Sequence, residues 1–298
     1  PIIEGGPLHG ENATPILVGL GKLGGQEPNF HSDVDVLFLY EGEGNTQPIK
    51  RDHRIRPTSN HHFFNELAKR VLQTATRTRP HGRLFDMDSK LRATHQHAPL
   101  AISLDDYETY LKEGQIPLWQ YMGLCKARVL FGTDTAKSRI QTLIVKTIAA
   151  SHQKPQLKSE IYQARLDSEE GATDRNLKRF QGGTMDIEYI VQMLQLLNGN
   201  AEDLQQPGTL LALQKLQEHG LLNEDDTRAL SKSYLFLRRV ESGLRLMDTT
   251  HRHDLPEHPL ELEKLASLLG YESPQSLVTV CRRYRRDNRQ RFEKIFNL

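Results

Sequence analysis

The chain has 298 residues, with 39 lysines and arginines against 38 aspartates and glutamates, and it contains two cysteines. This length suggests about two domains at roughly 100–200 residues each, and the near-neutral charge argues against a general nucleic-acid binder, which usually carries a strong basic excess. Two cysteines exclude a disulfide framework, and no apolar run reaches the roughly 18–20 residues of a membrane span. Because a signal peptide is also lacking, we expect a cytoplasmic protein. The lack of an initiator methionine suggests a fragment of a longer chain.

The N-terminal half alternates short apolar runs with turns. Residues 15–20 (PILVGL) and 34–40 (VDVLFLY) have the length and the β-branched and aromatic content of buried strands. Residues 61–76 repeat apolar side chains at the 3- and 4-residue steps of a helix, and residues 83–91 (RLFDMDSKL) alternate as a half-buried strand does. Two segments with few apolar residues are predicted to be irregular: a lead-in arm at 1–14 and a mobile loop at 41–59.

Beyond about residue 135 the apolar spacing becomes helical throughout. Short Gly, Pro or Asn breaks separate seven predicted helices, at 135–150, 157–170, 185–198, 209–219, 224–247, 259–270 and 274–297. The last of them carries clustered arginines, which we interpret as a solvated helix face rather than a phosphate site: Arg282, Arg283, Arg285, Arg286 and Arg289. The pattern predicts an α+β domain at residues 1–134 followed by an all-α helical bundle at residues 135–298.

A glycine-rich turn joins the first two predicted strands. Residues 19–24 (GLGKLG) match the G-x-G-x-x-G pattern of dinucleotide-binding folds, but that interpretation requires a crossover helix of a dozen or more residues. Gly25 and Pro28 interrupt the segment, and the next strand begins by about Asp33. A glycine turn can instead present backbone N–H groups to phosphate oxygens. The turn therefore favours a phosphate site over a dinucleotide-binding fold.

Two aspartates open the second strand, within the sequence S-D-V-D at residues 32–35. Side chains at i and i+2 of a strand share a face, so we expect Asp33 and Asp35 to project together. Neighbouring carboxylates repel unless a cation lies between them, and oxygen-only ligands favour Mg²⁺. A lone D-x-D more often belongs to a turn or an exposed strand edge. The glycine turn and a third carboxylate on a later strand, Asp88 or Asp86, favour a two-metal site for nucleotidyl transfer.

Four stretches of the chain carry a family resemblance. The run VGLGKLGGQEPNFHSDVDVLF resembles the signature G-x-G-K-L-G-G-x-E-L-x-x-x-S-D-x-D of the glutamine synthetase adenylyltransferase and adenylyl-removing enzymes. FDMDSKLR, LWQYMGLCKARVLFG and NLKRFQGGTMDIEYIVQ are similar to further motifs of the same family, so the resemblance spans nearly the whole chain. It implies a DNA-polymerase-β-like nucleotidyltransferase domain with a small mixed sheet, followed by a helical bundle.

The resemblance also implies functional residues. The metal-binding and catalytic aspartates would be Asp33, Asp35 and Asp88, with Mg²⁺ as cofactor, two ions expected, and ATP as substrate. The residues expected at the nucleotide and its phosphates are Gly24, Gly25, Ser32, Lys22, Lys90 and Arg92. Lys90 replaces the usual arginine, which would lose bidentate phosphate recognition. A second motif implies three residues at the cleft between domain and bundle: Lys178, Asp186 and Glu188.

The first-turn position of Asp186 and Glu188 also has an ordinary structural explanation. Thr184 is expected to cap the helix whose first turn contains these two residues. Acidic residues near a helix N-terminus are stabilised by the helix dipole.

Family members carry two such catalytic domains, one that attaches AMP to a tyrosine of glutamine synthetase and one that removes it by phosphorolysis, whereas this chain has one. We expect transfer of AMP from ATP with release of pyrophosphate. Three alternatives remain: the adenylyl-removing activity, a non-catalytic module that docks glutamine synthetase or a PII-type regulator, and a nucleotidyltransferase for a small alcohol or an RNA end. The expected partners are glutamine synthetase and a PII-type nitrogen signalling protein, without nucleic acid or membrane.

Overall fold

The chain forms two compact units. The computed structural model describes residues 2–4, 13–47, 56–77, 86–88, 99–113, 116–151, 154–247 and 253–297. Unit 1 consists of Pro1–Pro28 and Asp33–Ile148, and unit 2 of Asn29–Ser32 and Ala149–Leu298. The chain therefore passes from unit 1 to unit 2 inside a helix (α5, Asp134–Ser151) rather than between residues 134 and 135, and one short loop near the N-terminus belongs to unit 2.

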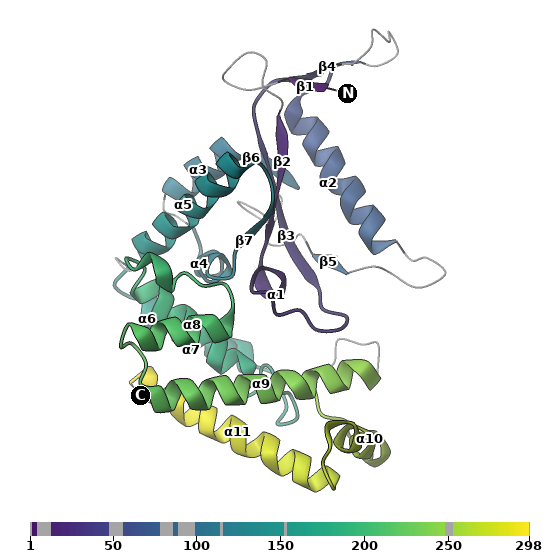
Figure 1. Ribbon diagram of the computed structural model, residues 1–298, viewed down its shortest axis with the longest axis vertical. Coiled ribbons are helices and arrows are strands. Elements are labelled where there is room, and N and C mark those ends of the chain that lie inside the picture. Colours follow the sequence, from purple (N-terminus) through teal and green to yellow (C-terminus); the bar gives the residue numbers. More distant parts are fainter. Residues whose placement is uncertain are drawn as a thin grey trace. The chain divides into compact units, whose positions relative to one another are not determined.

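Unit 1 is built on a small mixed sheet (Figure 1). Its five strands are β2 (Thr14–Gly19), β3 (Val34–Glu41), β5 (Met87–Asp88), β6 (Ala101–Ser103) and β7 (Arg128–Phe131). β2 pairs antiparallel with both β3 and β7. β5 and β6 each pair parallel with β3, β5 with its first residues and β6 further along. A separate antiparallel pair joins β1 (Ile2–Glu4) to β4 (Asn45–Gln47).

Helices contact strands of this sheet: α1 (Gly21–Gly24), α2 (Asn60–Thr76) and α3 (Leu104–Lys112). Unit 1 also contains α4 (Leu118–Leu124) and the first part of α5. Figure 1 shows α2 on one side of the strands and α3 with α5 on the other. Tyr40 of β3 stacks on Phe64 of α2 with ring centroids 4.6 Å apart. The pKa of Tyr40 is raised to about 12, mainly because its hydroxyl is desolvated by burial and to a lesser extent because of the negative charges of Glu43 and Asp106.

Unit 2 is all-helical within its described residues. Its helices are α6 (Leu157–Glu169), α7 (Thr184–Leu197), the short 3-10 turn η1 (Glu202–Leu204), α8 (Thr209–Glu218), α9 (Glu224–Met247), α10 (Pro259–Leu269) and α11 (Pro274–Ile295). α9 packs against α11, as Figure 1 shows, and the two bury an apolar core with α10 that includes Leu237, Leu265 and Cys281. Burial raises the pKa of the Cys281 thiol to about 12, so this cysteine packs as an apolar residue. None of the described helices combines the length and apolarity that a bilayer crossing demands.

The mixed α+β class is confirmed, and so are all eight predicted helices, most within one residue at each end. Two predictions of irregular structure are wrong in part, because β1 forms within the predicted arm and β4 within the predicted loop. Of the strand predicted at residues 83–91, the described part is residues 86–88, which contain β5. The structure adds α3, α4, β6 and β7, which the sequence pattern did not predict.

Candidate functional site

The glycine turn after β2 forms one helical turn, α1, and the side chain of Asp35 packs against its first residue, Gly21. Gly21 has a φ of +50°, in the left-handed region that favours glycine. A Cβ atom added to Gly21 would lie 2.3 Å from Oδ2 of Asp35, so the carboxylate occupies space that only glycine leaves open. The backbone supports this position, because the Leu20 N–H donates to the Asp35 carbonyl at 3.0 Å. Gly21 is thus a site residue that the motif comparison alone did not single out.

Gly24 is required by the packing of the chain, in addition to its predicted place at the phosphates. A Cβ atom on Gly24 would lie 1.8 Å from the carbonyl oxygen of Lys126, so the connection between α4 and β7 packs directly on this glycine. Nearby, Arg128 donates from Nε to the Gly24 carbonyl at 3.0 Å and from a terminal nitrogen to the Leu23 carbonyl at 3.1 Å. The chain packing therefore accounts for Gly24 without any ligand.

Lys126 and Arg128 hold the glycine turn against the sheet. Lys126 forms an ion pair with Glu27 at 2.8 Å, and both side chains are largely buried. Sequence reasoning missed the positioning role of these residues, although the signal was present: they are the basic residues of the K-A-R stretch in LWQYMGLCKARVLFG.

The aspartates lie where two parallel strands begin. Asp33 is exposed directly before β3, and Asp35, the second residue of β3, is half-buried. The backbones of Asp35 and Asp88 are register partners in the β3–β5 pair, and the Val34 N–H donates to the Asp86 carbonyl at 2.8 Å. In the described part of the chain no three His, Cys, Asp or Glu side chains form a ready metal site, and the Asp88 side chain lies outside that part.

The remaining residues predicted at the phosphates are spread over both units. Lys22 and Gly25 belong to the turn of unit 1, and the Gly25 N–H donates to the Gly21 carbonyl. Ser32 belongs to unit 2, where its hydroxyl accepts from the Asn29 N–H at 2.8 Å and from Arg245 of α9 at 3.2 Å. These bonds engage Ser32 in shaping its own loop. The other two predicted residues, Lys90 and Arg92, lie outside the described residues.

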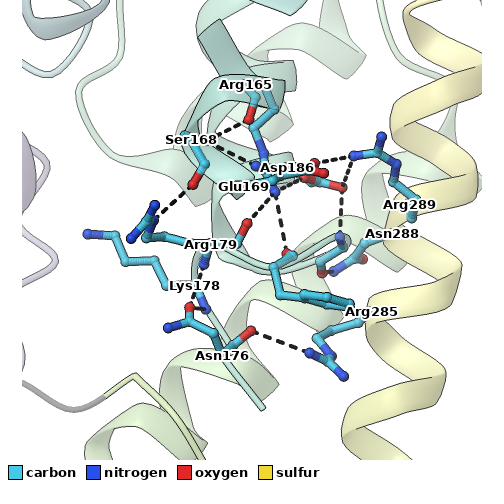
Figure 2. A network of polar contacts seen from close by, with 12 residues as sticks. Arg165, Ser168, Glu169, Asn176, Lys178, Arg179, Asp186, Arg285, Asn288 and Arg289 are labelled. Atoms are coloured by element: carbon cyan, nitrogen blue, oxygen red, sulfur yellow. Dashed lines mark hydrogen bonds and ion pairs between the residues drawn. The ribbon is translucent and has the colours of Figure 1, made fainter. Parts of the chain in front are cut away.

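The second motif falls in a buried polar network of unit 2 (Figure 2). Asp186 of α7 has no exposed surface and forms ion pairs with Arg165 of α6 and with Arg289 of α11, the second at 3.8 Å. It also accepts from the Gly182 N–H at 2.8 Å. Burial raises the pKa of the Asp186 carboxyl, and the guanidiniums of Arg165 and Arg289 counteract that effect. A carboxylate enclosed in this way holds three helices together.

The three residues of this motif do not converge. Figure 2 shows the Lys178 side chain pointing away from Asp186. Glu188 is half-buried and accepts a hydrogen bond from the Tyr234 hydroxyl at 3.3 Å. The predicted cap is also wrong: Gly183 occupies the N-cap position of α7 without a side-chain hydrogen bond, and Thr184 is the first helical residue. The sharp turn at Gly182–Gly183 leaves no place for a capping hydroxyl, because the helix backbone starts against the carbonyls of Leu177 and Lys178.

A small mixed sheet with a glycine turn beside aspartates at the start of a strand is consistent with a nucleotidyltransferase-like domain. Comparison with known proteins agrees with this class. Residues 3–143 match the family model described as glutamate-ammonia ligase adenylyltransferase, and residues 153–297 match the one described as GlnD PII-uridylyltransferase. Apart from residues 29–32, the first match falls in unit 1, and the second match lies within unit 2.

Curated relatives match nearly the whole chain. Each carries the name bifunctional glutamine synthetase adenylyltransferase/adenylyl-removing enzyme. The protein from Ralstonia nicotianae is 30% identical over 98% of this chain and 33% of its own length. The protein from Bordetella pertussis is 32% identical over 97% of this chain and 32% of its own length. The protein from Nitrosomonas europaea is 30% identical over 98% of this chain and 31% of its own length. This chain belongs to the glutamine synthetase adenylyltransferase family, and it spans about a third of the length of these relatives.

Proposed function

We propose that this chain transfers AMP from ATP to a tyrosine of glutamine synthetase in a Mg²⁺-dependent reaction that releases pyrophosphate. The observation that carries the proposal is the position of Asp35, which lies against Gly21 and whose backbone is in register with that of Asp88. The names of the curated relatives support the substrate and the regulation of nitrogen assimilation that it implies. We further propose that unit 1 has a DNA-polymerase-β-like fold.

The residues at the glycine turn fit Mg²⁺. The ion prefers oxygen ligands and is usually bound by one or two carboxylates together with substrate phosphates. Gly21 leaves open the space that Asp35 Oδ2 fills, and Asp33 precedes it by two residues. We propose that Asp33, Asp35 and Asp88 hold the metal, with two ions bound in the presence of the nucleotide. When bound, Mg²⁺ would neutralise triphosphate charge and lower the pKa of the attacking tyrosine from about 10.

The chain's own groups then have separate tasks. The tyrosine oxygen forms a bond to the α-phosphorus, and the bond from that phosphorus to the bridging oxygen breaks, so pyrophosphate leaves with the electron pair. Asp88 is the proposed general base that accepts the tyrosine proton; alternatively, it lowers the tyrosine pKa through the metal that it helps to hold. The proposed phosphate contacts are Lys22, through its charge, the backbone at Gly24 and Gly25, and Ser32, Lys90 and Arg92.

The opposite direction is the second candidate, because the curated relatives are named for both activities. In the removal reaction, an oxygen of phosphate forms a bond to the phosphorus of the AMP group, which gives ADP. The bond from that phosphorus to the tyrosine oxygen breaks, and the tyrosine oxygen leaves with the electron pair and takes up a proton. The deciding experiment offers the chain unmodified glutamine synthetase with ATP and, separately, AMP-modified glutamine synthetase with phosphate. We expect modification of the first form. Consumption of the second form alone would reverse the assigned direction, and consumption of neither would contradict the enzymatic proposal.

A non-catalytic docking module remains the third candidate, with a PII-type protein as partner, because unit 2 matches the family model described as a PII-uridylyltransferase. Thermal stabilisation by ATP separates this candidate from the enzyme. A catalytic site of the proposed kind should need Mg²⁺ for the ATP-induced shift in Tm, whereas an equal shift in EDTA would favour the docking module.

Gly21→Ala should lower adenylyl transfer by between about ten- and a hundredfold, since a misplacement of about 1 Å at a reacting site has effects of this size. The new Cβ atom would lie 2.3 Å from Asp35 Oδ2, so the carboxylate must move, and the left-handed φ adds about 1–2 kcal/mol of strain. The measurement is the rate of incorporation of labelled AMP at saturating ATP.

Gly123→Ala in α4 is the matched control, because a Cβ atom there meets nothing within 4 Å. It should retain the full rate. Wild-type activity in Gly21→Ala would show that the contact between Asp35 and Gly21 is not needed to position the Asp35 carboxylate for the reaction.

A further inference from the structure

Unit 2 contains a cavity of about 120 Å³, and its lining residues are distant in sequence from the glycine turn. Its walls come from the segment before α7, the segment before α10, and the helices α10 and α11. One water needs roughly 10–15 Å³ of such space, so the cavity has room for a ligand of several heavy atoms. Three aliphatic side chains form its apolar part: Leu255, Leu262 and Val278.

The polar lining of this cavity is dominated by arginine. Arg175, Arg282 and Arg285 contribute three guanidiniums, and Asp174 contributes the one carboxylate among the lining residues. Asp174 pairs with Arg282 at 3.3 Å, and both side chains are more than half exposed. Arg175 donates to the Leu255 and Pro256 carbonyls, which are neutral acceptors. The lining therefore carries two positive charges in excess.

Arg285 is the unusual member of the set. It is 5% exposed, and its Nε has no hydrogen-bond partner. One terminal nitrogen donates weakly to the Asn176 carbonyl at 3.4 Å, as Figure 2 shows, and the guanidinium lies 5.0 Å from the centre of the Phe180 ring. Among the described residues it forms no ion pair with a carboxylate. Burial lowers its pKa, and the charge of the nearby Asp174 offsets that effect only in part. A buried cation whose charge is incompletely balanced is costly, and a bound anion would offset that cost.

We propose that this cavity binds a phosphate group, either as inorganic phosphate or as the monoester of a small metabolite, with Arg282 and Arg285 as its ligands. A phosphate carries about −1.5 to −2 charges at pH 7, which matches the excess of the lining. Arginine is the side chain best suited to bind phosphate oxygens through two parallel hydrogen bonds. The apolar wall would accommodate the carbon part of a monoester. This site is separate from the proposed nucleotide site and does not depend on Mg²⁺.

The test is calorimetric titration of the full chain at low salt, without nucleotide or Mg²⁺, with inorganic phosphate and, separately, with glycerol 3-phosphate. We expect saturable binding at one site, tighter for whichever source is the ligand. Arg282→Gln should weaken binding at least about tenfold, as the loss of a charge-assisted hydrogen bond does. Asp174→Asn should tighten it, because the competing carboxylate is removed, and this opposite sign is not expected of a merely structural pair.

Two controls keep the proposal open to refutation. Arg286→Gln changes an exposed arginine of the same helix outside the cavity lining and should bind as the wild type does. The double variant Asp33→Asn/Asp35→Asn should also bind normally, which separates this site from the proposed catalytic one. No saturable binding by the wild type, equal weakening by Arg286→Gln, or loss of binding in the double aspartate variant would each overturn the proposal.

Discussion

The double substitution Asp33→Asn/Asp35→Asn is expected to lower adenylyl transfer to glutamine synthetase by about a thousandfold. Metal-assisted phosphoryl chemistry gains several kcal/mol from charge stabilisation, and each 1.36 kcal/mol corresponds to a factor of ten in rate. Asparagine keeps the shape of aspartate but removes the negative charge that would hold Mg²⁺. The measurement is the initial rate of labelled AMP incorporation, with Mg²⁺ varied for each protein.

Asp134→Asn provides the matched control for this experiment. Asp134 lies at the start of α5 in unit 1, is fully exposed and pairs with Lys137 at 3.4 Å. Its substitution removes an equal charge from the same unit and should leave the rate unchanged. If the double variant retained wild-type labelling, the assignment of the metal to the start of β3 would be wrong, whatever the activity of the family.

The second large effect concerns the stability of unit 2. Asp186→Asn is expected to lower the free energy of unfolding by about 3 kcal/mol, at the lower end of the range for breaking a buried ion pair. The substitution leaves the guanidinium of Arg165, which has no exposed surface, without its closest counter-charge. Glu169 remains paired with Arg165 at 3.2 Å and with Arg289 at 2.5 Å, which keeps the loss from being larger.

Denaturant unfolding followed by far-ultraviolet circular dichroism would measure this change. Asp225→Asn is the matched control, because Asp225 forms an exposed pair with Arg228 on the same unit. Exposed pairs contribute about 0–1 kcal/mol, so this control should unfold almost as the wild type does. A loss below about 1 kcal/mol for Asp186→Asn would show that the buried network does not hold the three helices together.

The helices that were predicted correctly are those with a long local pattern. α9 was predicted at its observed limits, residues 224–247, because its apolar spacing is complete within one stretch of sequence. α3 was missed although its signals were local. Ser103 accepts a hydrogen bond from the Asp106 N–H as its cap, and Asp105 lies in its first turn. β7 has four residues and depends on pairing with β2, which sequence periodicity alone does not reveal.

In the candidate site, too, the features set by local sequence were predicted and those set by long-range contacts were not. The S-D-V-D pattern and the following strand placed Asp33 and Asp35 at the start of β3 from sequence alone. The contact of Asp35 with Gly21 and the packing of Lys126 on Gly24 required the structure, because each joins segments that meet only after folding.

For this protein the sequence by itself determined the family, the order of the regular elements and the acidic residues worth testing, because motifs and helical periodicity are properties of contiguous chain. Only the tertiary structure decided which charges meet. From sequence alone, Asp186 is interpreted as an ordinary acidic residue in the first turn of a helix, and Arg285 as part of a solvated helix face. Folding instead encloses the first between arginines of α6 and α11 and buries the second beside a cavity. Ion pairing and desolvation depend on long-range contacts, so residue type and spacing do not reveal them in advance.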